Sequence, residues 1–237
     1  MNKDKLVNQA ELIQDFFGND TEPFFDKVAQ FNQLMMKYNS AIREVKTKLE
    51  ILNDELSFKG EENPIESIQS RIKKPVSIAK KLRKLGKPIT VESVEKNLSD
   101  VAGIRVICPF IEDIYQVAEM LMAQDDIVVI AIKDYITSPK PNGYRSFHMI
   151  VEVPVFFSKY KQPMRVEVQI RTVAMDFWAS LEHQLKYKNE NIKTAQIVQE
   201  LKECADVIAS TDLKMQNLRH QINGNSVEAI KLNQCEG

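Results

Sequence analysis

One short segment places an acid, an amide and two arginines on the same side of a strand. In segment 165–171, three apolar residues alternate with four polar ones, which are Arg165, Glu167, Gln169 and Arg171. Because successive side chains of a strand point to opposite faces, this alternation predicts one apolar and one polar face. The polar face combines a carboxylate that can accept a proton with amide and guanidinium groups that can orient a ligand.

Two further segments show the same alternation. The polar face holds His148 in segment 146–153 and Arg105 in segment 103–108. A sheet that packs on one side and faces water on the other would also give this pattern. Solvated faces are usually built from Lys, Glu and Thr, however, whereas Arg and His are suited to orienting a ligand. The residue types therefore favour a binding face.

A basic segment, residues 71–87, carries eight lysines and arginines and no acid. Ser77 lies in the first turn of a helix that begins near Pro75, and Arg71 and Lys73 precede it. Free N–H groups at a helix N-terminus bind phosphate together with nearby cations. We therefore expect a phosphate site, and a simple basic surface, for example for RNA, is the competing interpretation.

Two acids come from separate strand regions. Asp100 lies shortly before the strand that carries Arg105, and Glu167 lies on the polar face of another strand. Two carboxylates that face a cationic site suggest an Mg²⁺ ion shared with phosphates. For Asp100 alone, a helix cap or a salt bridge is the simpler role.

The segment "KPNGYRSFH", residues 140–148, carries more than a turn needs. A turn explains Pro141, Asn142 and Gly143. It does not explain the ring of Tyr144 with Lys140 and His148 around it. We expect Arg145 either to anchor the loop or to reach a phosphate.

Composition limits the classes of protein. The 237 residues have a net charge of −1, which argues against a protein whose main task is to coat nucleic acid. No apolar run approaches the roughly 18 residues that cross a membrane. Three cysteines without a CxxC pair indicate a reducing cytoplasm and no zinc finger.

Hydrophobic periodicity predicts an α/β (α+β) fold with a mixed sheet of about five strands flanked by helices. We expect an N-terminal helical region over 1–62, a catalytic domain over 63–190, and a C-terminal helix and tail over 191–237. Both terminal helices carry an apolar seam, from Phe24 to Leu56 and from Ile197 to Ile222. These seams could pack inside the protomer or against another subunit.

Several of these segments, taken in order, resemble a known family. The blocks are "SRIKKPVSIAKKL", "DVAGIRVIC", "KDYI", "PKPNGYRSFH", "VEVQIRT" and "MDFWASLEHQLKYK". Together they resemble the synthetase domain of the RelA/SpoT alarmone enzymes across about residues 63–190. The sequence has no His-Asp hydrolase motif and no room for the further domains of long relatives. It is therefore similar to the small alarmone synthetases, most of all to their RelP branch.

The resemblance implies a nucleotidyltransferase-like fold and a reaction. The family transfers the β,γ-pyrophosphate of ATP to the 3′-hydroxyl of GTP or GDP, which yields AMP and (p)ppGpp. By resemblance, Arg71 and Arg105 would sandwich the adenine, and ATP phosphates would be held by Lys73, Ser77, Lys81 and Lys84. Asp100 and Glu167 would hold Mg²⁺, and Glu167 would take the hydroxyl proton.

The resemblance also implies an acceptor site and an assembly. Tyr144 would stack on the guanine, with Lys140 and His148 near the acceptor's phosphates. The acceptor would be oriented by Gln169, Arg171 and Asp176. Trp178 is expected to pack, and Glu182 and His183 to support the site. Some small relatives are tetramers, which implies a homo-oligomer; RNA binding is possible but not indicated, and no membrane partner is expected.

Overall fold

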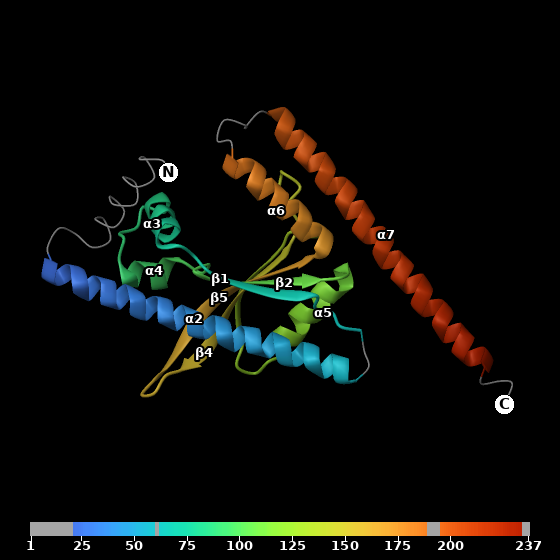
Figure 1. The fold of residues 1–237 in the computed structure, drawn as a ribbon, viewed down its shortest axis with the longest axis horizontal. Helices are drawn as coiled ribbons and strands as arrows, with labels where there is room; N and C mark the ends of the chain where they lie inside the picture. Colours follow the sequence, from blue (N-terminus) through green and yellow to red (C-terminus); the bar gives the residue numbers. More distant parts are fainter. Residues whose placement is uncertain (1–20, 60–61, 189–194, 234–237) are drawn as a thin grey trace.

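The protein is described by a computed structural model, which covers residues 21–59, 62–188 and 195–233. Figure 1 shows a central sheet with helices around it. The sheet has five strands in the order β1-β2-β5-β4-β3. Their bounds are β1 Ser67–Ile72, β2 Ala102–Cys108, β3 Val128–Asp134, β4 Phe147–Phe156 and β5 Lys161–Thr172. The predicted mixed sheet is thus confirmed.

Strand register brings the polar residues of the sheet into one row. β2 and β5 are parallel, so Gly103 pairs with Glu167 and Arg105 pairs with Gln169. β4 and β5 are antiparallel, which pairs His148 with the same Gln169. The polar positions of β2, β4 and β5 therefore meet around the middle of β5.

Helix α2, Thr21–Phe58, packs its seam inside the protomer. Leu34, Tyr38, Val45 and Leu49 are buried in the same core as the apolar residues of β4 and β5. Helix α5, Ile111–Met122, contacts both α2 and β5. For α2, the structure thus shows the first of the two alternatives, packing inside the protomer.

Two short helices, α3 Pro75–Lys84 and α4 Val91–Asn97, lie between β1 and β2 along the chain. Helix α3 begins with Pro75, where a missing N–H has no cost, and buries Ile78, Ala79 and Leu82. It ends before Gly86, whose φ of 65° is the left-handed conformation that glycine adopts readily. The expected start of this helix near Pro75 is confirmed.

The last two helices are α6 Val173–Lys188 and α7 Ala195–Asn233. Figure 1 shows α7 as a long diagonal helix beside α6. The middle of α7 faces the protein with polar residues: Asp212 accepts a 2.6 Å hydrogen bond from Thr172 Oγ1, and Gln216 donates a 2.8 Å bond to Glu112. Because these pairs set the rotation of α7, its predicted seam is only partly covered, and Met215, Leu218 and Ile222 are 50%, 49% and 64% exposed.

Two details of the sheet differ from the expectation. β1 was not identified by pattern, since its half-exposed edge position leaves no clear apolar alternation. β5 begins at Lys161 and includes Pro163, a residue type that is uncommon inside strands. Pro163 pairs only with β4, because β2 meets β5 from Glu167 onward, and a strand tolerates proline where no second neighbour needs its N–H.

The predicted boundaries at residues 62 and 190 stay predictions, since α2 and α7 both pack on elements between them. Residues 1–20 of the expected N-terminal region lie outside the described residues. No helix within the described ranges combines the length and the apolar character that crossing a membrane requires.

Candidate active site

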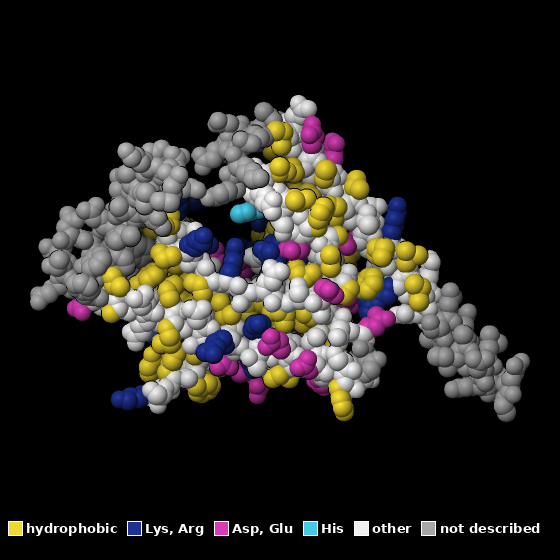
Figure 2. Space-filling view, viewed as in Figure 1, with side chains coloured by type: hydrophobic (Ala, Val, Ile, Leu, Met, Phe, Trp, Pro, Cys, Tyr) yellow, Lys and Arg dark blue, Asp and Glu magenta, His cyan; other side chains and the backbone are white. Residues whose placement is uncertain are grey.

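The site is built on the polar face of β2, β4 and β5. Along β4 and β5 buried and half-buried residues alternate, as the two-residue period predicts. Glu167 and Gln169 lie on β5, with Arg105 on one side and His148 on the other. Figure 2 shows Lys and Arg side chains gathered beside a hollow in the middle of the molecule.

A cavity of about 150 Å³ opens on the β1–β2 side of Glu167. Its lining includes Arg71, Gly103, Arg105 and Gln169. The side chain of Arg71 lies over Gly103, since a Cβ added there would be 3.5 Å from Arg71 Cγ. Arg105 Nε is buried and has no hydrogen-bond partner among the described residues. The two arginines predicted to hold one base therefore line one cavity.

Asp100 is held by two lysines, one just before α3 and one in its last turn. Its Oδ2 accepts hydrogen bonds from Lys73 Nζ at 2.7 Å and from Lys81 Nζ at 2.6 Å. Burial alone would raise the pKa of Asp100, but the two lysines outweigh it and lower the pKa. The salt-bridge role considered for Asp100 is thus confirmed, and the lysines predicted to bind phosphate stand beside the acid predicted to bind metal.

Ser77 and Lys84 share the outer face of α3 with Lys81. Ser77 is one turn before Lys81, and Lys84 is about one turn after it. In the part of the chain that the structure describes, neither makes a side-chain hydrogen bond, and both are exposed. The helix also starts without a side-chain cap. Because Pro75 has no N–H and the Ser77 N–H donates to the carbonyl of Lys74 at 2.8 Å, the Val76 N–H is the first-turn donor left for an anion among the described residues.

An aromatic cluster lies on the β3–β4 side of Glu167. The ring of Tyr135 meets the rings of Tyr144 and His148 edge-on, with centroids 6.0 and 5.2 Å apart. Lys140 Nζ is 4.5 Å from the centroids of both tyrosine rings. Burial lowers the pKa of Lys140, and Lys133 and Arg171 add to this effect. The residues predicted around the acceptor base are therefore together.

Tyr135 was not identified from the sequence. It follows β3 directly, where it looks like the apolar end of a strand. Its N–H donates a 3.0 Å hydrogen bond to the carbonyl of Ser146, so the β3–β4 pairing brings the ring to Tyr144. The one available signal was its place in the block "KDYI".

Arg171 is almost completely buried, with 5% of its surface exposed. It donates to Asp176 Oδ1 at 3.0 Å, to Tyr144 Oη at 2.6 Å and to Gln169 Oε1 at 3.0 Å. Asp176 also pairs with Arg105 at 3.2 Å. Arg171 and Asp176 thus connect the two sides of the site, and their predicted contacts with the acceptor stay predictions.

Glu167 lies where the two sides meet. Its Oε1 is 3.5 Å from His148 Nδ1, and its Oε2 accepts a 2.9 Å hydrogen bond from Gln169 Nε2. Burial would raise the pKa of Glu167, but His148 and Gln169 outweigh burial, so the pKa is lowered. Glu167 is therefore a carboxylate at neutral pH and can accept a proton or a cation.

Comparison with known proteins agrees with this geometry. Residues 70–192 match the region found in RelA/SpoT proteins. Over 192 residues the chain is 42% identical to the GTP pyrophosphokinase YwaC of Bacillus subtilis, which covers 81% of this chain and 91% of that protein. The chain belongs to the RelA/SpoT family.

Two further relatives support membership in the RelA/SpoT family. The GTP pyrophosphokinase YjbM of Bacillus subtilis is 34% identical over 193 residues, which are 81% of this chain and 90% of that protein. The crystal structure of the small alarmone synthetase 1 from Bacillus subtilis, bound to its product pppGpp, matches with a TM-score of 0.75 and 33% identity. It covers 81% of this chain and 98% of that chain, and the predicted fold class is confirmed.

The helix after the sheet supports the site from outside. Trp178 is buried, and its Nε1 donates a 2.9 Å hydrogen bond to the carbonyl of Leu201 in α7, which confirms the packing role. Glu182 accepts a 3.0 Å bond from Asn142 Nδ2 and so holds the loop that carries Tyr144. His183 lies on the same helix and is exposed.

Proposed function

We propose that this protein is a GTP pyrophosphokinase that makes (p)ppGpp and AMP from ATP and GTP or GDP. The observation that carries the proposal is the position of Glu167 between two different nucleotide-binding surfaces. On one side the cavity with Arg71 and Arg105 suits a flat base between guanidinium planes. On the other side Tyr144 offers a ring beside a lysine, which suits a second nucleotide.

The proposed pyrophosphate transfer requires that the negative charge of the ATP phosphates be offset. The 3′-oxygen of the acceptor attacks the β-phosphorus of ATP, and the bond from that phosphorus to the oxygen shared with the α-phosphorus breaks. AMP leaves with that oxygen, and the hydroxyl proton passes to Glu167. Lys73, Lys81 and Lys84 of the α3 region offset phosphate charge, and the Ser77 hydroxyl and the Val76 N–H can donate hydrogen bonds to a phosphate.

We also propose that Asp100 and Glu167 hold Mg²⁺ together with the phosphates of ATP. The donor set fits, because Mg²⁺ is usually bound by one or two carboxylates plus phosphates and waters. Asp100 Oδ1 is buried without a hydrogen-bond partner among the described residues, which leaves a lone pair for a cation. When bound, the ion would supply positive charge at the transferring pyrophosphate.

One assay tests the reaction. The protein is incubated with ATP, GTP and Mg²⁺, and the nucleotides are separated by anion-exchange chromatography. We expect AMP to appear in step with a guanosine nucleotide that carries two more phosphates. Formation of ADP, or no turnover despite nucleotide binding, would refute the proposal and favour a binding module for nucleotides or RNA that lacks chemistry. Omitting Mg²⁺ should abolish turnover.

We further propose a homo-oligomer, by family resemblance a tetramer, that works in the cytoplasm. Its interface would include the exposed apolar stripe of α7, defined by Val207, Met215, Leu218 and Ile222. The cytoplasm supplies ATP and GTP and keeps exposed thiols such as Cys204 reduced. Light scattering after size exclusion should give a multiple of 27.2 kDa.

A charge on the stripe tests the interface. Leu218→Glu should lower the mass toward that of one chain, because an unpaired carboxylate is costly to bury. Asn217→Glu, which adds the same charge on another side of α7, should leave the mass unchanged. A wild-type monomer, or equal effects of both variants, would refute the assignment.

A further inference from the structure

The loop 140–145, which carries Tyr144, lies directly against helix α7. Gly143 touches the helix: a Cβ added to it would lie 2.5 Å from Ala205 Cβ and 3.3 Å from Lys202 Cα. Its φ of 85° is also in the left-handed region, which disfavours any side chain there. Gly143 is thus required both by its own backbone and by the closeness of α7.

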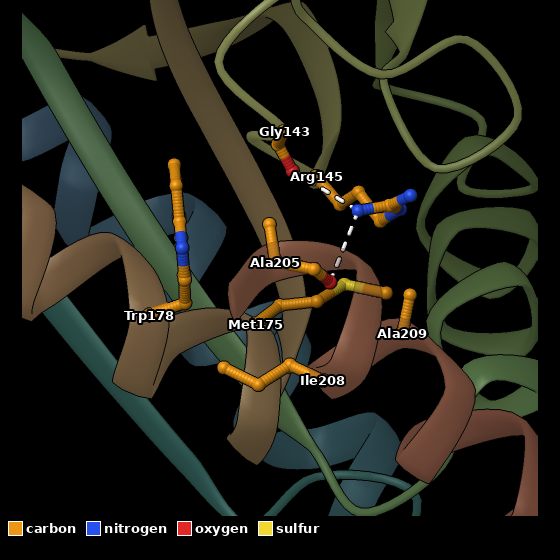
Figure 3. Close-up of a pocket in the computed structure, with 7 residues that line it drawn as sticks. All are labelled: Gly143, Arg145, Met175, Trp178, Ala205, Ile208 and Ala209. Carbon is orange, nitrogen blue, oxygen red and sulfur yellow. Dashed lines mark hydrogen bonds between the residues drawn. The ribbon is translucent and has the colours of Figure 1, made fainter. Parts of the chain in front are cut away.

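Arg145 ties this loop to helix α7. It donates to two acceptors in α7 and to one in the loop itself. Its Nη1 donates to the carbonyl of Gly143 at 3.1 Å and to the carbonyl of Ala205 at 3.2 Å. Its Nη2 donates to Asp206 Oδ1 at 3.0 Å. Figure 3 shows the guanidinium lying between the loop and α7, with both carbonyl bonds drawn. Sequence left open whether Arg145 anchors the loop or reaches a phosphate, and the structure shows an anchor.

The contact between loop and helix is tightly packed. The cavity that Gly143, Arg145, Trp178 and Ala205 help to line has a volume of about 10 Å³, which is at most the space of one water. One turn earlier on α7, the carbonyl of Leu201 accepts the Trp178 bond. Donors from the loop and from α6 therefore hold the same stretch of α7. The small free volume between them leaves the loop no room to shift.

The position of Tyr144 depends on this anchor. Tyr144 stands between the two residues that meet α7, Gly143 and Arg145. Its hydroxyl is held by His148 and Arg171. Its backbone lies before β4, which begins at Phe147, and its backbone hydrogen bonds, with Asn142 Oδ1 and the Lys140 N–H, stay within the same loop. A ring can offer its face to a base only if the backbone beneath it is fixed.

We propose that Arg145 is a positioning residue for the acceptor nucleotide, which acts by fastening the Tyr144 loop to helix α7. This inference rests on the proposed function, since it needs an acceptor base at Tyr144. It makes α7, which lies outside the polar face of the sheet, a determinant of acceptor binding. The donor side, with Arg71, Arg105 and α3, has no part in this contact.

The test compares KM for GTP with KM for ATP. Arg145→Ala should raise KM for GTP about tenfold or more and leave KM for ATP within about twofold, which corresponds to a loss of about 1.4 kcal/mol in acceptor binding. Arg145→Lys keeps a charge near Asp206 but loses the fork that spans the Ala205 carbonyl and the Asp206 carboxylate, so it should fall between wild type and Arg145→Ala. Binding of GTP by calorimetry should weaken in the same order.

Two control variants separate the anchor from general effects on α7. Asn217→Ala alters an exposed position of α7 and should change neither KM. Arg219→Ala removes another arginine that ties α7 to the body, through Asp113 at 2.6 Å and Glu62 at 2.6 Å, without touching the loop. It should lower the melting temperature but leave the ratio of the two KM values unchanged.

A steric pair gives an independent test. Gly143→Ala should push the loop from α7 and raise KM for GTP, and adding Ala205→Gly should restore part of the affinity by removing the opposing Cβ. Arg145→Ala with an unchanged KM for GTP, or with equal rises in both KM values, would overturn the inference. That result would leave the proposed function standing, because the function fails only if wild type makes no AMP from ATP and GTP.

Discussion

Tyr144 Oη lies 2.8 Å from His148 Nε2, and the other nitrogen of that ring faces Glu167. Arg171 donates to the same hydroxyl at 2.6 Å, so His148 and Arg171 hold it together. The ring proposed to carry the acceptor base is thus connected through one imidazole to the carboxylate proposed to receive the acceptor's proton. Binding of the base and the reacting end of the site are parts of one hydrogen-bond network.

Glu167→Gln should bind both nucleotides and turn over poorly. The amide keeps the shape of the side chain but cannot accept the hydroxyl proton, and general base catalysis typically contributes about 10²–10⁴-fold. We expect kcat to fall by at least about a hundredfold while the Kd for GTP changes little. Glu152→Gln, on the same face but paired with Arg165, is the control; a near-normal kcat for Glu167→Gln would remove the base role.

Tyr144→Ala should raise KM for GTP much more than KM for ATP. Stacking of a base on an aromatic ring is worth about 1–3 kcal/mol, so a rise of about tenfold or more is expected. Tyr144→Phe keeps the ring and loses only the hydrogen bonds of the hydroxyl with His148 and Arg171. It should have the smaller effect. Tyr160→Ala in the β4–β5 hairpin is the control, and equal changes in both KM values for Tyr144→Ala would place the ring outside the acceptor site.

Arg105→Lys should weaken ATP rather than GTP. Lysine keeps the charge but lacks the plane that stacks on a base, and such an interaction is worth about 1–2 kcal/mol when desolvated. A rise of about tenfold in KM for ATP is expected, with KM for GTP within about twofold. Arg43→Lys on the exposed side of α2 should change neither, and an unaffected KM for ATP in Arg105→Lys would contradict a stacked adenine.

Asp212→Asn should change how stability depends on pH. Burial raises the pKa of Asp212, and the bond from Thr172 offsets only part of this. Because its pKa is raised in the folded state, the protonated carboxyl of Asp212 is favoured by folding. Its contribution to the free energy of unfolding is therefore fully present below the unfolded pKa of about 3.9, and it is lost as pH rises through the folded pKa. The asparagine can still accept the Thr172 bond and has no such loss.

Denaturant unfolding at about pH 4.5, 6 and 7.5 measures this effect of Asp212→Asn. The free energy of unfolding of the variant relative to wild type should rise with pH and then level off. Thr211→Ser, at the exposed neighbouring position, should show no trend. A relative stability that falls with rising pH would mean that the charged hydrogen bond outweighs burial.

The sequence predicts those features of the fold that depend on the local periodicity of apolar and polar residues. Alternation around Glu167 gave the correct face of β5, and the seam through Tyr38 and Val45 lies on the buried side of α2. Alternation fails where contacts come from distant polar pairs. The rotation of α7 is set by Thr172 with Asp212, a pair 40 residues apart, and no helical period reveals such a partner.

The candidate site divides in the same way. Arg71 and Arg105 were expected together and share a cavity. Tyr135 was missed because the register of β3 on β4, which has an irregularity between Val129 and Ala131, decides where its ring lies. The role of Arg145 was likewise hidden, since its partners in α7 follow about 60 residues later.

The strand order has a consequence for synthesis of the chain. β5 is made after the other four strands but lies in the centre of the sheet, between β2 and β4. Until residue 161 has been made, the β1–β2 and β3–β4 pairs have no strand to join them, and each has an unpaired edge. A ribosome-bound chain of that length also lacks Glu167. The two surfaces proposed to bind nucleotides are therefore joined and completed in a single late step. A chain that ends before Glu167 lacks the proposed catalytic carboxylate.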